Sequence, residues 1–359
     1  MSLPESTVQR ARRSGNPVIH GNRATFIWQG RTAPYLMSDL NGWASTYRPF
    51  KRLSPGHEST SHKSVWSCSL TIPRDAYVEY AYYNPATRQR FLDPMNHHTV
   101  SNGMGARNNF FYMPENMPSP FAMRRADVDG GVLSSHRVET KWLRDEHERE
   151  IYFYRPSVKG PVPLLVVYDG QDYLQRAKLT TIVDNLIADK HIQPIAMVML
   201  PHAGRWRNVE YACSDATLLW LDQVVLPLAQ KRLNLLDINK HLGTYGVLGA
   251  SLGGTMSMYT GLRMPEIFGR VISQSGVFMM ESIDFAVVDL VRHGHAQEIK
   301  IWMDIGRLDE LLEDNRRMHA LLNQEGYQVT YREFSAGHNY TAWRDDLWRG
   351  LEAMFPYQK

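Results

Sequence analysis

The sequence predicts two domains of different class, an all-β sandwich followed by an α/β domain with a mainly parallel central sheet. Three observations support this prediction. Short β-favouring runs separated by turn residues fill roughly the first third of the chain. A stretch with three prolines in eight residues follows at positions 113–120. From about residue 130, apolar strands alternate with amphipathic helical stretches, which is typical of parallel α/β sheets.

The first domain is predicted to span residues 1–125. Its expected strands are residues 23–29, 34–37, 64–71, 76–84 and 108–113. Turn residues separate them, including an Asp-Leu-Asn-Gly run at 39–42 and Asn102-Gly103. Many short strands at this spacing predict an antiparallel sandwich, because each strand buries one face.

The second domain is predicted to span residues 130–359, after the proline-rich stretch, which cannot continue a helix or a central strand. Its expected strands are residues 150–154, 164–168, 195–200, 244–248, 270–275, 300–304 and 328–334. Its expected helices are residues 180–190, 216–232, 253–260, 311–324 and 340–354. Several strands are almost wholly apolar, which indicates a sheet covered on both faces.

Composition narrows the class of protein. Apolar residues make up 43% and charged residues 21% of the 359 positions, as in an ordinary globular protein. No apolar run approaches the roughly 20 residues of a membrane span, so no membrane partner is expected. The net charge of +3 is too small to favour nucleic acid as a partner. The polar start and the two cysteines lead us to expect a cytoplasmic protein without disulfides. The sequence makes no prediction of oligomeric state.

The strongest chemical motif is Gly249-Ala-Ser251-Leu-Gly253, between a predicted strand and a predicted helix. This is the context of a nucleophile elbow, in which a serine occupies a strained turn and nearby glycines leave room for backbone. Ser251 is therefore the predicted nucleophile. A glycine-rich turn with an incidental serine is the alternative.

A serine hydroxyl needs a base, and the base needs an orienting acid. In this fold class the chain order is serine, acid, histidine. Asp309 follows the strand predicted at 300–304, and His338 follows the strand predicted at 328–334. Asp309 could instead be an ordinary helix N-cap, with Asp304 or Glu310 as the acid.

Two further loops are expected to complete the site. The oxyanion hole needs two backbone N–H groups, one from Leu252 and the other from Gly170 or Gln171. The loop after the strand at 195–200 lies at the sheet edge where ligands bind. The substrate-binding residues predicted in that loop are Arg205, Trp206, Arg207 and Glu210. A solvated loop with an Arg–Glu ion pair is the alternative for it.

The second domain resembles the esterase D family of α/β-hydrolases, and especially its enterochelin (enterobactin) esterase group. The matching stretches are residues 164–173, 207–211, 249–254, 306–309 with Asn315, and 337–344. The resemblance implies an α/β-hydrolase fold, the same Ser251–Asp309–His338 triad and Arg207 near the substrate. The family usually reads Gly-Gly-His-Asp around the histidine, whereas Ala336 and Asn339 stand here.

The first domain resembles the early-set, carbohydrate-module-48-like module with an immunoglobulin-like fold. Residues 39–43, Trp66, 78–80 and 92–96 carry this likeness. Such a module is often fused ahead of these esterases.

We therefore expect a serine carboxylic-ester hydrolase that acts on a small-molecule ester through an acyl-enzyme. Neither a metal nor an organic cofactor is expected. A siderophore trilactone of the enterobactin type would suit the two arginines Arg205 and Arg207, since iron–catecholate complexes are anionic. A feruloyl or acetyl ester on plant polysaccharide, or a general aryl ester, would suit a carbohydrate-type first domain. An acyltransferase with the same triad is a further alternative.

Overall fold

The computed structural model describes residues 3–54, 64–144 and 148–357, and it divides into two compact units. The first unit comprises residues 1–117 together with two short segments from later in the chain, 306–310 and 334–339. The second unit comprises 118–305, 311–333 and 340–359. The predicted domain limits, 1–125 and 130–359, stay predictions.

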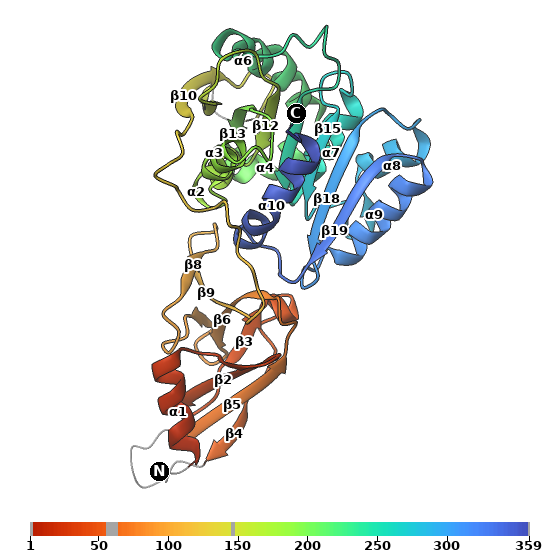
Figure 1. The fold of residues 1–359 in the computed structure, drawn as a ribbon. Coiled ribbons are helices and arrows are strands. Elements are labelled where there is room, and N and C mark those ends of the chain that lie inside the picture. Colours follow the sequence, from red (N-terminus) through yellow and green to blue (C-terminus); the bar gives the residue numbers. More distant parts are fainter. Residues whose placement is uncertain (1–2, 55–63, 145–147, 358–359) are drawn as a thin grey trace. The chain divides into compact units, whose positions relative to one another are not determined.

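The first unit holds helix α1 (Leu3–Ser14) and two antiparallel sheets (Figure 1). One sheet has the order β1-β2-β5-β4, with strands β1 (Val18–His20), β2 (Arg23–Gly30), β5 (Ser64–Thr71) and β4 (Lys51–Ser54). The other has the order β3-β6-β9-β8, with strands β3 (Tyr35–Ser38), β6 (Tyr77–Asn84), β9 (Arg107–Tyr112) and β8 (Thr99–Ser101). β7 (Gln89–Phe91) pairs with β6.

Aromatic side chains from both sheets form the core between them. Phe26 of β2 meets Tyr80 of β6 edge to face at 5.0 Å and Phe111 of β9 at 5.9 Å. Such edge-to-face pairs add to the stabilisation from burial. The two sheets thus form the predicted sandwich. That it is immunoglobulin-like stays a prediction.

The second unit is built on an eight-stranded sheet with the order β10-β11-β13-β12-β14-β15-β18-β19. Its strands are β10 (Val132–Glu139), β11 (Glu148–Arg155), β12 (Leu164–Tyr168), β13 (Ala196–Leu200), β14 (Gly246–Ala250), β15 (Arg270–Gln274), β18 (Lys300–Gly306) and β19 (Gln328–Phe334). The ladders from β13 through β12, β14 and β15 to β18 are parallel, whereas β10 and β11 run antiparallel. β12, β13 and β14 are buried along their whole length, as their apolar sequences predict. The predicted α/β-hydrolase fold is confirmed.

Helices cover this sheet (Figure 1). They are α2 (Gly170–Gln175), α3 (Leu179–Ala188), α4 (Arg207–Tyr211), α5 (Asp215–Trp220), α6 (Leu226–Arg232), α7 (Leu252–Arg263), α8 (Ala286–His293), α9 (Leu312–Gln324) and α10 (Tyr340–Met354). Three 3-10 or π turns, η1 (Asp39–Asn41), η2 (Gly204–Trp206) and η3 (Leu221–Val225), and a small hairpin, β16 (Met279–Met280) with β17 (Ile283–Asp284), complete the described elements.

The single helix predicted at residues 216–232 is not continuous. The structure has α5, then the π-helical turn η3, then α6. Pro227 lies near the start of α6 and has no N–H to donate to the preceding turn. A single π-helical turn within a run of α-helix is the form in which the rare π-helix usually occurs.

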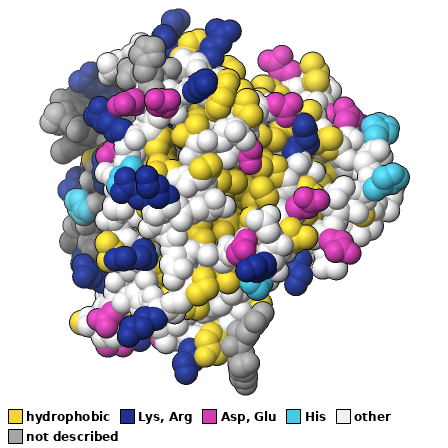
Figure 2. All heavy atoms as spheres, turned by 90° about the horizontal axis from the view of Figure 1, so that it is seen from above, with side chains coloured by type: hydrophobic (Ala, Val, Ile, Leu, Met, Phe, Trp, Pro, Cys, Tyr) yellow, Lys and Arg dark blue, Asp and Glu magenta, His cyan; other side chains and the backbone are white. Residues whose placement is uncertain are grey.

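Charged side chains of both signs are scattered over the face shown in Figure 2, with a band of hydrophobic side chains between them. This face is therefore neither uniformly basic nor uniformly acidic.

Both cysteines are free, Cys68 buried and Cys213 partly buried. Burial raises the pKa of the Cys68 thiol to about 12 and that of Cys213 to about 11. Within the described ranges, no helix is long and apolar enough to cross a membrane.

Candidate active site

Ser251 stands at the sharp turn between β14 and α7. Its backbone has φ 58° and ψ −129°, a region of dihedral angles that residues other than glycine rarely adopt. The Ser251 N–H donates to the carbonyl of Gln274 in the neighbouring strand at 2.9 Å, which holds the turn in place. This geometry is the one that a nucleophile elbow requires.

The two glycines that flank Ser251 allow the turn to close. A Cβ on Gly249 would lie 2.2 Å from the carbonyl oxygen of Gly253. A Cβ on Gly253 would lie 3.1 Å from the carboxylate of Asp169. At Gly249 the spacing is therefore explained by backbone that packs directly against backbone, and at Gly253 by the close approach of the Asp169 side chain.

Asp309 and His338 form a hydrogen-bonded pair. Oδ2 of Asp309 lies 2.9 Å from Nδ1 of His338. The Asp309 side chain is fully buried, whereas that of His338 is 30% exposed. This arrangement can orient an imidazole and stabilise it when it takes up a proton.

The two other candidate acids are placed differently. Asp304 accepts hydrogen bonds from Gln274 and Trp302 inside the sheet, and burial, reinforced by the charge of Asp346, raises its pKa to about 8. Glu310 is exposed. Of the three acids, Asp309 is the one whose hydrogen bond to His338 the structure records.

The strand order explains why these positions matter. β14, β15 and β18 are parallel neighbours, so their carboxyl ends lie at one edge of the sheet. Ser251 directly follows β14, and the turn that carries Asp309 directly follows β18. β19, which precedes His338, is the next strand of the same sheet. Ligands bind at this edge in open α/β sheets.

The predicted oxyanion loop follows β12. Gly170 begins α2 and packs so closely on β13 that a Cβ would lie 2.5 Å from the carbonyl carbon of Met199. Leu252 begins α7. The N–H groups of a helix's first turn have no partner within the helix, so those of Leu252, Gly170 and Gln171 are of the right kind. The side chain of Gln171 accepts the N–H of His202 at 3.2 Å.

Arg207 connects the oxyanion loop to the elbow. Its guanidinium donates to both carboxylate oxygens of buried Asp169, at 2.7 and 2.6 Å, and reaches the carbonyl of Ala250 at 3.4 Å. Burial alone would lower the pKa of Arg207, but the hydrogen bonds and charge of Asp169 outweigh it and raise that pKa. The side chain keeps 23% of its surface exposed. Its predicted contact with substrate stays a prediction.

Glu210 has a partner within the protein. Its carboxylate is 3% exposed and forms a two-pronged ion pair with Arg149 of β11, at 2.9 and 2.8 Å. The ion pair thus ties α4 to β11, and a contact of Glu210 with substrate stays a prediction. The alternative of a solvated Arg–Glu pair does not describe this ion pair, which is buried. The partner lies 61 positions away, where sequence spacing gives no warning of it.

Arg205 and Trp206 both lie in η2, where Arg205 is exposed and Trp206 is half-buried. The Arg205 guanidinium lies 5.0 Å from the centre of the Trp206 ring, and that of Arg144 lies 5.7 Å from it. Arg205 and Arg144 are both exposed. Two guanidinium groups therefore lie beside one indole ring, where cation–π attraction favours them. The predicted contact of Arg205 and Trp206 with substrate stays a prediction. Arg144 lies far from η2 in the chain, so the sequence alone does not predict its contact with Trp206.

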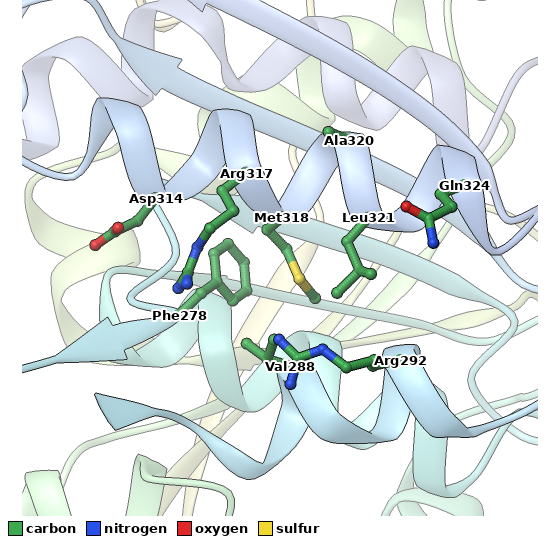
Figure 3. A pocket seen from close by; sticks show the side chains of 9 residues that line it. All are labelled: Phe278, Val288, Arg292, Asp314, Arg317, Met318, Ala320, Leu321 and Gln324. Atoms are coloured by element: carbon green, nitrogen blue, oxygen red, sulfur yellow. The ribbon is translucent and has the colours of Figure 1, made fainter. Parts of the chain in front are cut away.

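A separate pocket lies between α8 and α9 (Figure 3). It has a volume of about 260 Å³ and an apolar floor made by Phe278, Val288, Met318 and Leu321. Its two arginines, Arg292 and Arg317, both form ion pairs with Asp284. None of the predicted catalytic or binding residues lines it. Among the residues that the structure describes, no group of three His, Cys, Asp or Glu side chains could hold a metal ion.

Similarity to known proteins extends over both units. Residues 144–354, more than half of the chain, match the family described as "Putative esterase". The iron(III) enterobactin esterase of Dickeya dadantii is 27% identical, over 97% of this chain and 92% of that protein. The iron(III) enterobactin esterase of Escherichia coli K12 is 22% identical, over 73% of this chain and 67% of that protein.

Solved structures show the same fold. The ferric enterobactin esterase of Salmonella typhimurium superimposes with a TM-score of 0.76 at 19% identity, over 92% of this chain and 93% of that one. A ferulic acid esterase superimposes with a TM-score of 0.55 at 16% identity, over 63% of this chain and 98% of its own. Because residues 144–354, more than half of the chain, match the family described as "Putative esterase", the protein belongs to that family and is a carboxylic ester hydrolase.

Proposed function

We propose that the protein is a serine esterase that works through a Ser251–His338–Asp309 triad and an acyl-enzyme. The observation that carries the proposal is the 2.9 Å hydrogen bond between Asp309 and His338 Nδ1. In a triad the acid holds one ring nitrogen of the histidine and the other acts as the base, so Nε2 is assigned as the base. The strained turn at Ser251 supports the same assignment, because it holds the hydroxyl of an elbow serine exposed to substrate.

In the proposed reaction, Ser251 Oγ attacks the ester carbonyl carbon while His338 Nε2 takes the hydroxyl proton. The tetrahedral intermediate collapses, the carbon–oxygen ester bond breaks, and the imidazolium gives its proton to the leaving alcohol. Water then attacks the acyl-enzyme with His338 again as base, releasing the acid and free Ser251. Asp309 stabilises the imidazolium in both halves.

The negative oxygen of each intermediate is proposed to lie against the N–H of Leu252 and that of Gly170 or Gln171. Loss of one such donor typically costs about 100- to 1000-fold in kcat. The Arg207–Asp169 clamp supports this role, because it fixes the loop that carries Gly170 against the end of β14.

For the substrate we propose an iron(III) siderophore trilactone of the enterobactin type. Similarity to the Dickeya dadantii enterobactin esterase covers 97% of this chain and so includes the β-sandwich. The exposed arginines Arg205 and Arg144 beside the half-buried Trp206 would attract an anionic aromatic complex.

A feruloyl ester is the second candidate substrate, favoured by the fold shared with a ferulic acid esterase. That likeness covers 63% of this chain, so it offers no counterpart for much of the rest. Transfer of the acyl group to an alcohol instead of water is a third possibility that uses the same triad.

A substrate panel with a serine variant tests these proposals. Wild type, Ser251→Ala and the control Ser69→Ala, an exposed strand serine, are assayed on enterobactin with and without iron, methyl ferulate, acetylated xylan and nitrophenyl acetate. We expect turnover of the siderophore to fall by at least about 1000-fold in Ser251→Ala and to stay unchanged in Ser69→Ala.

Each proposal can fail separately in this experiment. Full turnover by Ser251→Ala would show that the triad is wrong. If the wild type hydrolyses only feruloyl or aryl esters, the proposal of a siderophore substrate is wrong. Ester products formed with added alcohol at the expense of the free acid would identify an acyltransferase.

A further inference from the structure

The turn at η1 in the first unit is held rigidly. The side chain of Asn41 accepts the N–H of Ser38 at 2.9 Å and donates to the carbonyl of Leu36 at 2.9 Å. Gly42 then closes the turn in the left-handed region with φ 58°. Asp39, the first residue of η1, therefore projects from a fixed backbone.

The Asp39 carboxylate is buried, with 4% of the residue exposed, and has defined partners. Oδ2 accepts the backbone N–H of Glu79 at 2.7 Å, and Oδ1 accepts the indole N–H of Trp43 at 3.0 Å. Oδ2 also receives the side-chain amide of Asn339 at 3.4 Å. Two of these donors belong to the sandwich, and the third lies next to the predicted catalytic histidine.

The same carboxylate packs against the backbone on the other side of that histidine. A Cβ added to Gly337 would lie 2.3 Å from Cγ of Asp39 and 2.4 Å from its Oδ1. Only a glycine allows this approach. One side chain of the β-sandwich thus touches both neighbours of His338.

Two more contacts tie the catalytic loops to the sandwich. The N–H of Tyr77, the first residue of β6, donates to the carbonyl of Ser335 at 3.0 Å. Leu308, next to Asp309, packs against the aromatic core of the sandwich. The segments 306–310 and 334–339 accordingly belong to the same compact unit as the sandwich.

We propose that Asp39 is a positioning residue for catalysis: it fixes the backbone on both sides of His338 and so keeps the imidazole in register with Asp309. This inference rests on the proposed triad. It gives the β-sandwich a part in the chemical step through a residue that does not touch the substrate.

The charges around Asp39 explain the amide at position 339. Burial and the negative charge of Glu79 raise the pKa of Asp39, the hydrogen bonds from Glu79 and Trp43 lower it, and the charge of Asp309 raises it again. A carboxylate at position 339 would add another acid to this group at hydrogen-bond distance from Asp39. The amide of Asn339 donates a hydrogen bond there instead.

The test compares Asp39→Ala and Asp39→Asn with Asp93→Asn. Asp93 is also a buried acid of the sandwich, and its carboxylate accepts from Asn16, Tyr80, Tyr82 and the N–H of Met95. Both kcat and KM are measured on an ester that the wild type hydrolyses in a Ser251-dependent way. Hydrogen exchange is followed by mass spectrometry in peptides covering 334–339.

We expect Asp39→Ala to lower kcat by about 10- to 100-fold with little change in KM, because a displaced base slows chemistry more than binding. Exchange in 334–339 should become faster in the same variant. Asp39→Asn should show both effects more weakly, and Asp93→Asn should show neither at equal folded fraction. If both Asp39 variants have the same kcat and the same exchange rate in 334–339 as the wild type, the proposal is wrong. It is also wrong if Asp93→Asn changes kcat and exchange as much as the Asp39 variants do.

A charge swap keeps the test valid if the Asp39 variants fold poorly. Asn339→Asp should lower kcat, and the double variant Asp39→Asn/Asn339→Asp should regain most of that loss because one carboxylate again faces one amide. Failure of this rescue would count against the proposal. A wild type without Ser251-dependent turnover would instead refute the proposed function, and the exchange measurement would still decide whether Asp39 holds the loop.

Discussion

At the scale of single residues, position in the fold decides what each acid does. Asp309 and Asp304 lie five positions apart, yet one pairs with an imidazole and the other is enclosed by the sheet. Asp304 meets the indole N–H of Trp302 at 2.8 Å and the amide of Gln274 at 3.0 Å. It is therefore a structural acid behind the site.

The raised pKa of Asp304, about 8, makes folding stability depend on pH. Between about pH 4 and pH 8 the folded protein keeps a proton that the unfolded chain, with an ordinary aspartate pKa near 3.9, releases. The free energy of unfolding should therefore fall as the pH rises through this range. Asp304→Asn, which mimics the protonated acid, should flatten the dependence.

Urea unfolding of wild type and Asp304→Asn at pH 5, 6, 7 and 8 measures this effect. The wild type should lose more stability than the variant between the lowest and highest pH. Identical slopes for the two proteins would show that Asp304 is ionised in the fold throughout.

The sequence predicted Ser251, Asp309 and His338 because their order along the chain and their positions after strands are local features. It did not predict the ion pair of Glu210 with Arg149, because that pair depends on a partner that the fold brings close. One hint was available, since Arg149 occupies an inward-facing position of β11, alternating with Ile151 and Phe153. A charged residue on a buried face requires a partner.

At the scale of elements, the Arg149–Glu210 pair joins β11 to α4, the helix that begins at Arg207. Arg149→Ala would leave a buried, unpaired carboxylate and should reduce the free energy of unfolding by about 3–5 kcal/mol. The double variant Arg149→Met/Glu210→Met should be closer to wild type because it removes both charges. Chemical denaturation of the three proteins measures the difference; a double variant less stable than Arg149→Ala would contradict it.

Strands with a strong apolar pattern were predicted almost to the residue, whereas β10 was not predicted at all. Four of its first five positions are exposed and the fifth is half-buried, so it lacks the alternation that identifies a strand. Its place at the sheet edge, hydrogen-bonded to β11 along its length, stabilises it instead. The break at η3 escaped prediction because the apolar spacing continues through it.

At the scale of the whole molecule, the sequence predicted two domains but not that the loops bearing Asp309 and His338 pack with the first. That grouping depends on contacts between segments some 300 positions apart, such as Asn339 with Asp39. Because of this grouping, we expect esterase activity to be lost when the sandwich unfolds.

Phe26→Ala tests this link. Phe26 is fully buried between Tyr80 and Phe111, and its truncation should cost about 3–5 kcal/mol of sandwich stability. On heating, this variant should lose esterase activity while the sheet of the second unit still resists proteolysis. Phe268→Ala, the same change in the core of the second unit, should lose activity and resistance together. Simultaneous loss in both variants would contradict the prediction.

The two cysteines make the protein convenient for labelling chemistry. A thiol reacts as its thiolate, and pKa values near 12 and 11 leave almost no thiolate at neutral pH. Maleimides and spin-label reagents should therefore spare the native chain. A cysteine introduced at Met104, which is 84% exposed, would then be modified selectively, so that fluorophores can report on the sandwich during turnover without first removing Cys68 or Cys213.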